Sequence, residues 1–365
     1  MNTNLLNGND SLKNILIKIE DKVTQAEKDR SLMESKLKDK GVEITPGSKI
    51  SSMINKIDEV NNITIIGDEK LPSWYKPEFK VEDMWINGNI INIKKAYLTS
   101  STINNKIYCI GGDSDVNTKD NNNECYDVNT NTWITKEKMI TARNRLTSSI
   151  IDNKIYCIGG QNSGNSYLNK NECYDTNNNT WTTKKEISSK RELTSSTVDN
   201  KIYCIGGYSG NYLNNNECYD VNSDTWTTKK KMITERMGLT SSIVDDKIYC
   251  IGGYSNSKYL NNNECYDTNS DTWTTKKVMI TERMGLTSNI IDNKIFCIGG
   301  STGGIFKGYL NNNEYYDIIS DIWGTKKDMN IKREYLASNT VDNKIYCIGG
   351  YNGNDYLNNN EIYIP

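Results

Sequence analysis

From about residue 81 to the C-terminus, short apolar runs alternate with polar turns in a pattern that repeats six times. A unit contains a Leu-Thr-Ser-Ser-like stretch, an Asp-Asn-Lys-like turn, the run Lys-Ile-Tyr/Phe-Cys-Ile-Gly-Gly, a variable loop, an Asn-Glu-Cys-Tyr-Asp-like run, a polar turn and a Trp. Alternating apolar positions, β-branched residues and regular turn signals predict four short antiparallel strands per unit, named here the first to fourth strands. The glycine doublets recur every 46 to 50 residues, which is typical of stacked or radial arrays.

Three features of this unit resemble the kelch repeat. They are the glycine doublet, a Tyr in the third strand, and a Trp six or seven residues after it (Tyr126, Tyr174, Tyr219, Tyr266, Tyr316; Trp133, Trp181, Trp226, Trp273, Trp323). The resemblance covers residues 81–365 and implies an all-β, six-bladed kelch-type propeller around a central channel. We expect these Tyr and Trp side chains to pack between blades rather than to bind a ligand.

The last unit is one strand short, because it ends with its third strand at residues 360–365 and has no Trp. Trp85 stands 26 residues before Gly111, the interval that also separates Trp133 from Gly159. We therefore expect residues 81–86 to be a fourth strand that completes the last blade and closes the ring. Closure would remove an open sheet edge.

Residues 1–60 share nothing with the repeats and are predicted to be helical. Apolar residues recur at alternating spacings of four and three, interrupted once by Arg30, in the seam Leu12, Leu16, Ile19, Val23, Ala26, Arg30, Met33 and Leu37. This pattern favours a coiled coil that forms a homo-oligomer through residues 12–37. The alternative is one amphipathic helix packed on the propeller. A second short helix is expected over residues 50–60, and residues 61–80 are predicted to be a linker.

Residues 37–57 resemble a segment of tail-associated structural proteins of phages and prophages of low-GC Gram-positive bacteria. The abundance of Asn, Lys and Ile agrees with an AT-rich genome. The resemblance implies a protein that is made in the cytoplasm without a signal peptide and carried in a virion or phage tail. The N-terminal ten residues are polar and unlike a signal sequence.

Composition narrows the functional classes. The formal net charge is −2, which argues against non-specific nucleic-acid binding, and no apolar run reaches membrane-spanning length, so no membrane insertion is expected. The 365 residues include no histidine, the commonest general base and metal ligand. The turns beginning at Asp220 and Asp267 lack the glycine and distal glutamate of a calcium loop. We therefore expect no metal, no cofactor and no catalytic residue.

The ten cysteines are predicted to be reduced and buried. Six lie in second strands and four in third strands, and in the last two units Tyr315 and Ile362 replace the third-strand Cys. A position that accepts Cys, Tyr or Ile is an apolar packing position. Disulfides between second and third strands are the alternative.

A candidate binding surface follows from the topology, because first strands begin and second strands end on one face. Three residues before the Leu of each first strand is a cation, expected at the channel mouth: Lys95, Arg143, Lys190, Arg236, Arg283 and Arg333. The loops between second and third strands add Tyr167, Tyr208, Tyr212, Tyr254, Tyr259, Tyr309, Tyr351 and Tyr356. Tyr among Asn, Ser and Gly is typical of binding surfaces. The alternative for the cations is structural pairing, with Glu235, Glu282 or backbone carbonyls.

The sequence thus favours a non-catalytic binding module that recognises a cell-surface glycan or anionic polymer, or a protein ligand, as part of a phage tail. Two alternatives remain open. One is an intracellular kelch adaptor for protein interactions, and the other is a propeller enzyme that acts on a sugar, which the missing histidine disfavours.

Overall fold

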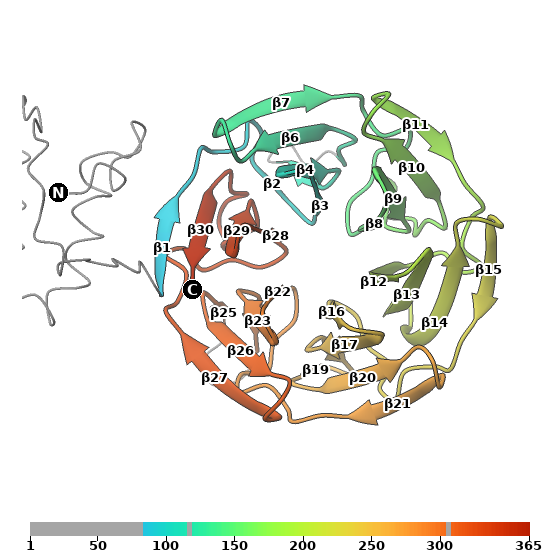
Figure 1. Ribbon diagram of the computed structural model, residues 1–365, viewed down its shortest axis with the longest axis vertical. Helices are drawn as coiled ribbons and strands as arrows, with labels where there is room; N and C mark the ends of the chain where they lie inside the picture. Colours follow the sequence, from blue (N-terminus) through green and yellow to red (C-terminus); the bar gives the residue numbers. More distant parts are fainter. Residues whose placement is uncertain (1–82, 115–118, 304–307) are drawn as a thin grey trace, which may run out of the picture. The chain divides into compact units, whose positions relative to one another are not determined.

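The computed structural model describes residues 83–114, 119–303 and 308–365, and the unit that contains them spans Asp83–Pro365. The predicted helices at 12–37 and 50–60, the linker and the phage-like segment lie outside the described residues. Within this unit, six four-stranded antiparallel sheets surround a central channel (Figure 1). The prediction of an all-β, six-bladed propeller is confirmed. Among the described residues there is no helix of the length and hydropathy needed to span a membrane.

The first strands lie innermost and line the channel. They are β3 (Thr99–Ile103), β8 (Thr147–Ile151), β12 (Glu192–Val198), β16 (Thr240–Val244), β22 (Thr287–Ile291) and β28 (Ala337–Val341), and they define blades 1 to 6 in that order. The second strands are β4 (Lys106–Ile110), β9 (Lys154–Ile158), β13 (Lys201–Tyr208), β17 (Lys247–Ile251), β23 (Lys294–Ile298) and β29 (Lys344–Ile348). Tight turns join each pair, and Asp152 (φ 53°) shows the left-handed conformation that hairpin turns of this type require.

The third and fourth strands form the outer half of each blade. The third strands are β6 (Asn123–Asp127), β10 (Asn171–Asp175), β14 (Tyr212–Asp220), β20 (Asn263–Asp267), β26 (Asn313–Asp317) and β30 (Asn360–Ile364). The fourth are β7 (Thr132–Lys136), β11 (Thr180–Thr183), β15 (Thr225–Thr228), β21 (Thr272–Thr275), β27 (Ile322–Lys326) and β1 (Met84–Asn87). Three two-stranded sheets extend from one face: β2 (Lys95–Ala96) with β5 (Asp113–Ser114), β18 (Tyr254–Ser255) with β19 (Lys258–Tyr259), and β24 (Ser301–Thr302) with β25 (Gly308–Tyr309).

The ring closes as predicted, with the N-terminal strand in the last blade. β1 pairs antiparallel with β30, and Trp85 lies opposite Tyr363. The two rings are 5.1 Å apart, and the Trp85 indole N–H donates to the Lys327 carbonyl of blade 5 at 2.7 Å. Blade 6 therefore contains strands from both ends of the propeller unit.

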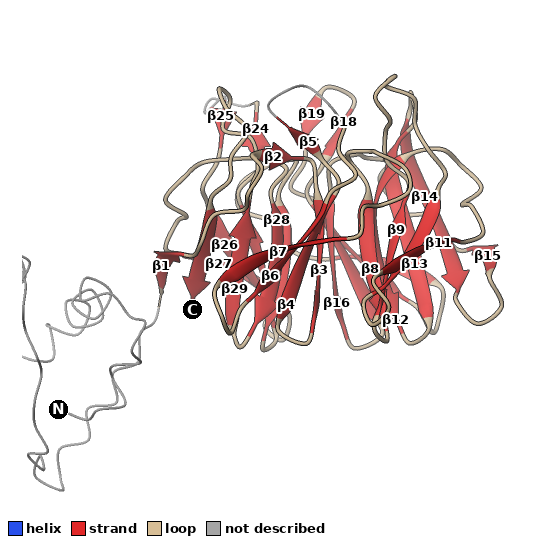
Figure 2. Cartoon of the chain, turned by 90° about the horizontal axis from the view of Figure 1, so that it is seen from above, coloured by secondary structure: helices blue, strands red, loops and turns tan. Residues whose placement is uncertain are grey.

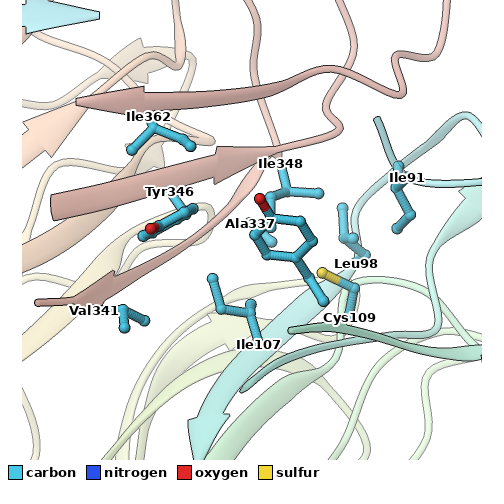
Figure 3. Packing of buried hydrophobic residues seen from close by; sticks show 10 residues of the cluster. Ile91, Leu98, Ile107, Cys109, Ala337, Val341, Tyr346, Ile348 and Ile362 are labelled. Atoms are coloured by element: carbon cyan, nitrogen blue, oxygen red, sulfur yellow. The ribbon is translucent and has the colours of Figure 1, made fainter. Parts of the chain in front are cut away.

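The hydrophobic core consists of clusters between neighbouring blades. Between blades 6 and 1, Ile107 and Cys109 pack against Val341, Tyr346 and Ile348 (Figure 3). The third-strand Tyr and fourth-strand Trp pack in the same clusters, as expected. The Tyr hydroxyl also donates to the Asn or Asp before the Trp, and in blade 4 Asp271 in turn accepts the backbone N–H of Lys230 from blade 3. Equivalent hydrogen bonds join every pair of neighbouring blades.

All ten cysteines are buried and free, which confirms the prediction and excludes the disulfide alternative for this structure. Strand register explains why. Cys109 lies opposite Glu124, and Cys125 is the next residue along, so the two side chains point to opposite faces of the blade. They belong to different interblade clusters.

We expect all ten thiols to react with a thiol reagent once the protein is denatured without reductant, and few to react in the native state. Burial raises the pKa of Cys157 and Cys250 to about 12, so the unreactive thiol form dominates near neutral pH. Intact-mass measurement after alkylation counts the modified residues. Fewer than ten additions to denatured protein would reveal bridges.

Candidate binding face

The segments before the first strands and the loops after the second strands lie on one face, termed here the loop face. Backbone bridges or strand pairs connect the two sets in every blade, for example Asn144 with Gln161, and Met237 with Tyr254. The small sheets β18–β19 and β24–β25 stand on this face, and tight turns form the opposite one (Figure 2). The topology therefore gathers the predicted loop residues as expected.

The expectation that the predicted cations line the channel mouth is wrong. Lys95, Arg143, Arg236, Arg283 and Arg333 are completely buried. Each cation is paired with the Glu of the third strand in its own blade: Lys95 with Glu124, Arg143 with Glu172, Arg236 with Glu264, Arg283 with Glu314 and Arg333 with Glu361, at 2.7–3.5 Å. They are therefore structural, and their partners are these glutamates rather than Glu235 and Glu282.

The prediction for Lys190 is also wrong, because Lys190 is exposed and Arg191 occupies the buried position in blade 3. Arg191 pairs with Glu217 and donates to the Cys204 carbonyl at 3.1 Å. Blade 3 has one residue fewer than the others between the buried cation and the following Leu. Counting three residues back from Leu193 therefore finds the wrong residue.

The buried pairs tie the segment before each first strand to the second and third strands. The Arg236 guanidinium also donates to the Cys250 carbonyl at 3.0 Å, and Glu264 accepts the backbone N–H groups of Ile233 and Thr234. Burial lowers the pKa of Arg333, and the Glu361 carboxylate opposes that effect. The recurring glutamates are thus hydrogen-bonding groups of the fold.

The eight predicted tyrosines do lie together on the loop face, and all are half-buried. We call them the tyrosine belt. Edge-to-face ring pairs join blades 2 and 3, 3 and 4, and 5 and 6: Tyr167 with Tyr208 at 5.8 Å, Tyr212 with Tyr254 at 6.0 Å, and Tyr309 with Tyr351 at 5.6 Å. Further pairs lie within blades, Tyr208 with Tyr212, Tyr254 with Tyr259 and Tyr351 with Tyr356. Burial raises the pKa of Tyr167 and Tyr309, so their hydroxyls stay protonated at neutral pH.

At the centre of the loop face, a cavity of about 170 Å³ occupies the mouth of the channel. Its walls include Tyr97, Arg145, Glu192 and Tyr335. The Tyr97 and Tyr335 rings stack at 4.2 Å, and the Arg145 guanidinium lies over both, 4.4 and 5.0 Å from their centroids. Arg145 also pairs with Glu192 at 3.0 Å. None of these four residues was identified from the repeat pattern.

One backbone position explains this cluster. The residue just before the first-strand Leu is left-handed in five blades, and it is Tyr97 (φ 57°), Arg145 (φ 53°), Gly238 (φ 61°), Gly285 (φ 63°) or Tyr335 (φ 48°). Their backbones form an arc of hydrogen bonds, Arg145 to Tyr97 to Tyr335 to Gly285 to Gly238, with N···O distances of 2.7–2.9 Å. Blade 3 lacks this residue, and the arc is open there beside Glu192. A non-glycine residue in this conformation costs about 1 kcal/mol or more, so three bulky residues here were a signal of function.

Below the mouth, side chains of the first strands link all six blades around the channel. In successive blades Thr147 bonds Ser195 at 2.8 Å, and Thr240 bonds Ser288 at 2.7 Å. Asn339 of blade 6 donates to Ser100 of blade 1, which completes the circle. The Thr-Ser-Ser pattern thus encodes a polar seam between blades.

Comparison with known families places this architecture. A family model described as the Attractin/LZTR1 beta-propeller matches residues 107–359. No curated protein matches the chain at a significant level. Within the described residues, no group of three or more Cys, Asp and Glu side chains is placed to hold a metal ion.

Proposed function

Because this chain belongs to the Attractin/LZTR1 β-propeller family, we propose that it is a non-catalytic binding module whose ligand lies on the loop face against the tyrosine belt. The observation that carries the proposal is the belt itself. Five neighbouring blades place eight half-buried tyrosines on one face, and three edge-to-face pairs bridge blades 2 and 3, 3 and 4, and 5 and 6. Rigid aromatic contact area of this kind costs little conformational entropy on binding.

The ligand class we favour is a cell-surface glycan. Tyrosine rings offer apolar edges and faces to sugar C–H groups, and their protonated hydroxyls donate hydrogen bonds to sugar oxygens. The six buried cations are each paired with a carboxylate, so they supply no attraction for an anionic polymer. A neutral or weakly charged glycan therefore fits this face better than a polyanion.

Binding without catalysis is supported by the state of the nucleophilic side chains. The thiols of Cys297 and Cys347 are buried, and burial raises the pKa of each to about 12. The third-strand glutamates are occupied by buried cations and backbone N–H groups. The chain has no histidine to act as a general base.

The setting we propose is a phage tail or tail-like particle, in which several propellers are joined through residues 12–37. This part of the proposal rests on the heptad seam and on the resemblance of residues 37–57, both outside the described residues. Several copies on one particle would convert weak single sites into firm adsorption through avidity.

We expect Tyr208→Ser/Tyr254→Ser to reduce adsorption of the purified protein to bacterial cells at least about tenfold, since aromatic residues dominate such contact surfaces. Fluorescently labelled protein and cell pull-down measure the loss. Ile319→Ser is the matched control, because Ile319 is an exposed apolar residue in a turn on the opposite face. Melting curves of all variants confirm folding.

Treatment of the cells separates the possible ligands. Periodate, which cleaves sugar diols, should abolish adsorption, and protease should leave it unchanged. Adsorption that is lost to protease and resists periodate would contradict the glycan and favour the protein-adaptor alternative. Full adsorption by the folded double variant would contradict the tyrosine belt as the site.

A further inference from the structure

The channel mouth departs from the sixfold pattern of the rest of the propeller. The buried ion pairs, the interblade hydrogen bonds and the channel-lining hydroxyls recur from blade to blade, so they are explained by the fold. Tyr97, Arg145 and Tyr335 occupy a left-handed position that is filled by Gly238 and Gly285 in two other blades. The fold therefore does not require bulky side chains at this position, and a role in ligand binding would explain why three blades have them.

Glu192 supplies an independent observation. Its side chain is buried, with a relative exposure of 7%, and it lines the cavity. One carboxylate oxygen, Oε2, accepts from Arg145, whereas Oε1 has no hydrogen-bond donor among the described residues. A buried carboxylate oxygen without a donor is costly, and a ligand that brings a donor would relieve that cost.

We propose that the channel mouth is a subsite for one uncharged sugar residue of the ligand, held by Glu192 and Arg145 and packed against Tyr97 and Tyr335. This inference rests on the proposed function, because it assigns to the glycan a specific point of attachment within the loop face. The tyrosine belt then contacts the remainder of the chain.

The chemistry of the lining selects this ligand class. Glu192 and Arg145 form a neutral pair, so an anion meets the carboxylate and a cation meets the guanidinium, and ions of either sign are disfavoured. A pair of sugar hydroxyls can donate to the Glu192 carboxylate and accept from the Arg145 guanidinium at the same time. Arg145 retains 26% side-chain exposure, so it is accessible from the mouth.

The volume and the lining of the cavity agree with a single sugar ring. A cavity of about 170 Å³ is large enough to hold several water molecules. The lining combines leucines that directly precede first strands, such as Leu239 and Leu286, with first-strand threonines, Thr147, Thr194 and Thr240. One face of a sugar ring is apolar and its rim is polar, which suits such a lining.

Saturation-transfer NMR and calorimetry with the full chain test the subsite. The probes are the methyl glycosides of glucose, galactose and N-acetylglucosamine, together with glucuronic acid and glucosamine as charged counterparts of glucose. We expect at least one neutral glycoside to bind, and its affinity to exceed that of the charged sugars by about tenfold or more. No transfer to any neutral glycoside, or equal binding of a charged one, would overturn the proposal.

Glu192→Gln should weaken the neutral glycoside about tenfold or more, because a charge-assisted hydrogen bond is lost. Glu334→Gln is the matched control, because Glu334 occupies the equivalent position in blade 6. Its backbone pairs with Tyr351 as the backbone of Glu192 pairs with Tyr208, and it is also buried. Glu334 does not line the cavity. This control variant should bind as the unmodified protein does. Equal binding by both variants and the parent would refute the role of Glu192.

Tyr97→Gly/Tyr335→Gly copies the residues found in blades 4 and 5 and should abolish glycoside binding in a folded protein. The same variants separate this inference from the proposed function. If the channel-mouth variants still adsorb normally to cells while Tyr208→Ser/Tyr254→Ser does not, the ligand binds the loop face and the assignment of the channel mouth as a subsite is wrong. If neither set affects adsorption, the proposed function itself fails.

Discussion

Deleting residues 1–88 should unfold or aggregate the propeller, whereas deleting residues 1–82 should leave it as stable as the full chain. The longer deletion removes all of β1, exposes the edge of β30, and abolishes both the Trp85–Tyr363 contact and the hydrogen bonds that the Asp83 carboxylate accepts from the Tyr363 hydroxyl and the Lys327 backbone N–H. Loss of one buried Trp alone costs about 3–5 kcal/mol, a large part of the ~5–15 kcal/mol that stabilises a typical domain. Differential scanning calorimetry and size-exclusion chromatography report the outcome.

A point variant isolates the closure from the deletion. Trp85→Ala in the full chain should lower the free energy of unfolding by about 3–5 kcal/mol. Equal melting temperatures for the two truncated proteins would show that β1 is dispensable. The ring would then be held by the interblade clusters and the channel seam alone.

Arg191→Ala should lower the free energy of unfolding by about 3–5 kcal/mol, because it leaves the Glu217 carboxylate buried without its cation. Lys190→Ala is an unusually close control, since Lys190 is the adjacent residue and is exposed. That substitution should change stability by less than about 0.5 kcal/mol. Urea unfolding monitored by tryptophan fluorescence measures both.

A second pair of variants tests the coupling. Arg283→Met combined with Glu314→Gln should cost less than the sum of the two single substitutions, because the double variant leaves no unpaired buried charge. Equal stabilities of Arg191→Ala and Lys190→Ala would refute the structural role of the buried cation.

Much of the fold is predictable from the sequence because every unit repeats the same pattern of strands and turns. The strand order, the burial of the thiols and the closure at Trp85 all follow from spacing, since a repeat displays which positions tolerate exchange and which unit lacks a strand. Exchange of Cys with Tyr315 and Ile362 was sufficient to identify packing positions. The gathering of the tyrosine belt on one face also follows from topology.

The burial of the cations could not be predicted from their spacing along the chain. Arg236 and Glu264 are 28 residues apart, and only the folded blade brings them together. Spacing along the chain gives the edge of the sheet at which a residue lies, and says nothing about whether its side chain points to solvent or into the blade. The prediction of Lys190 was wrong for a simpler reason, because blade 3 has one residue fewer before its Leu and the count therefore reached the neighbour of Arg191.

The channel mouth was missed because a search for repeats favours what recurs. Tyr97, Arg145 and Tyr335 are aligned with Gly238 and Gly285, and Glu192 stands just before the position that blade 3 lacks, so none belongs to a shared motif. Aligning the six units and inspecting the position before each Leu for exceptions would have found them. The informative positions of a repeat protein for function are those at which the units disagree.

The open position in the backbone arc beside Glu192 has a consequence for how a ligand is oriented. A ring of six equivalent blades would offer a long ligand six orientations of equal free energy around the channel axis, and all six would be equally populated. The missing residue in blade 3 removes that rotational degeneracy, because only one azimuth places a ligand group beside Glu192 with Arg145 at its flank. A chain molecule with distinct ends would consequently leave the mouth in a single direction, with a fixed polarity across the face.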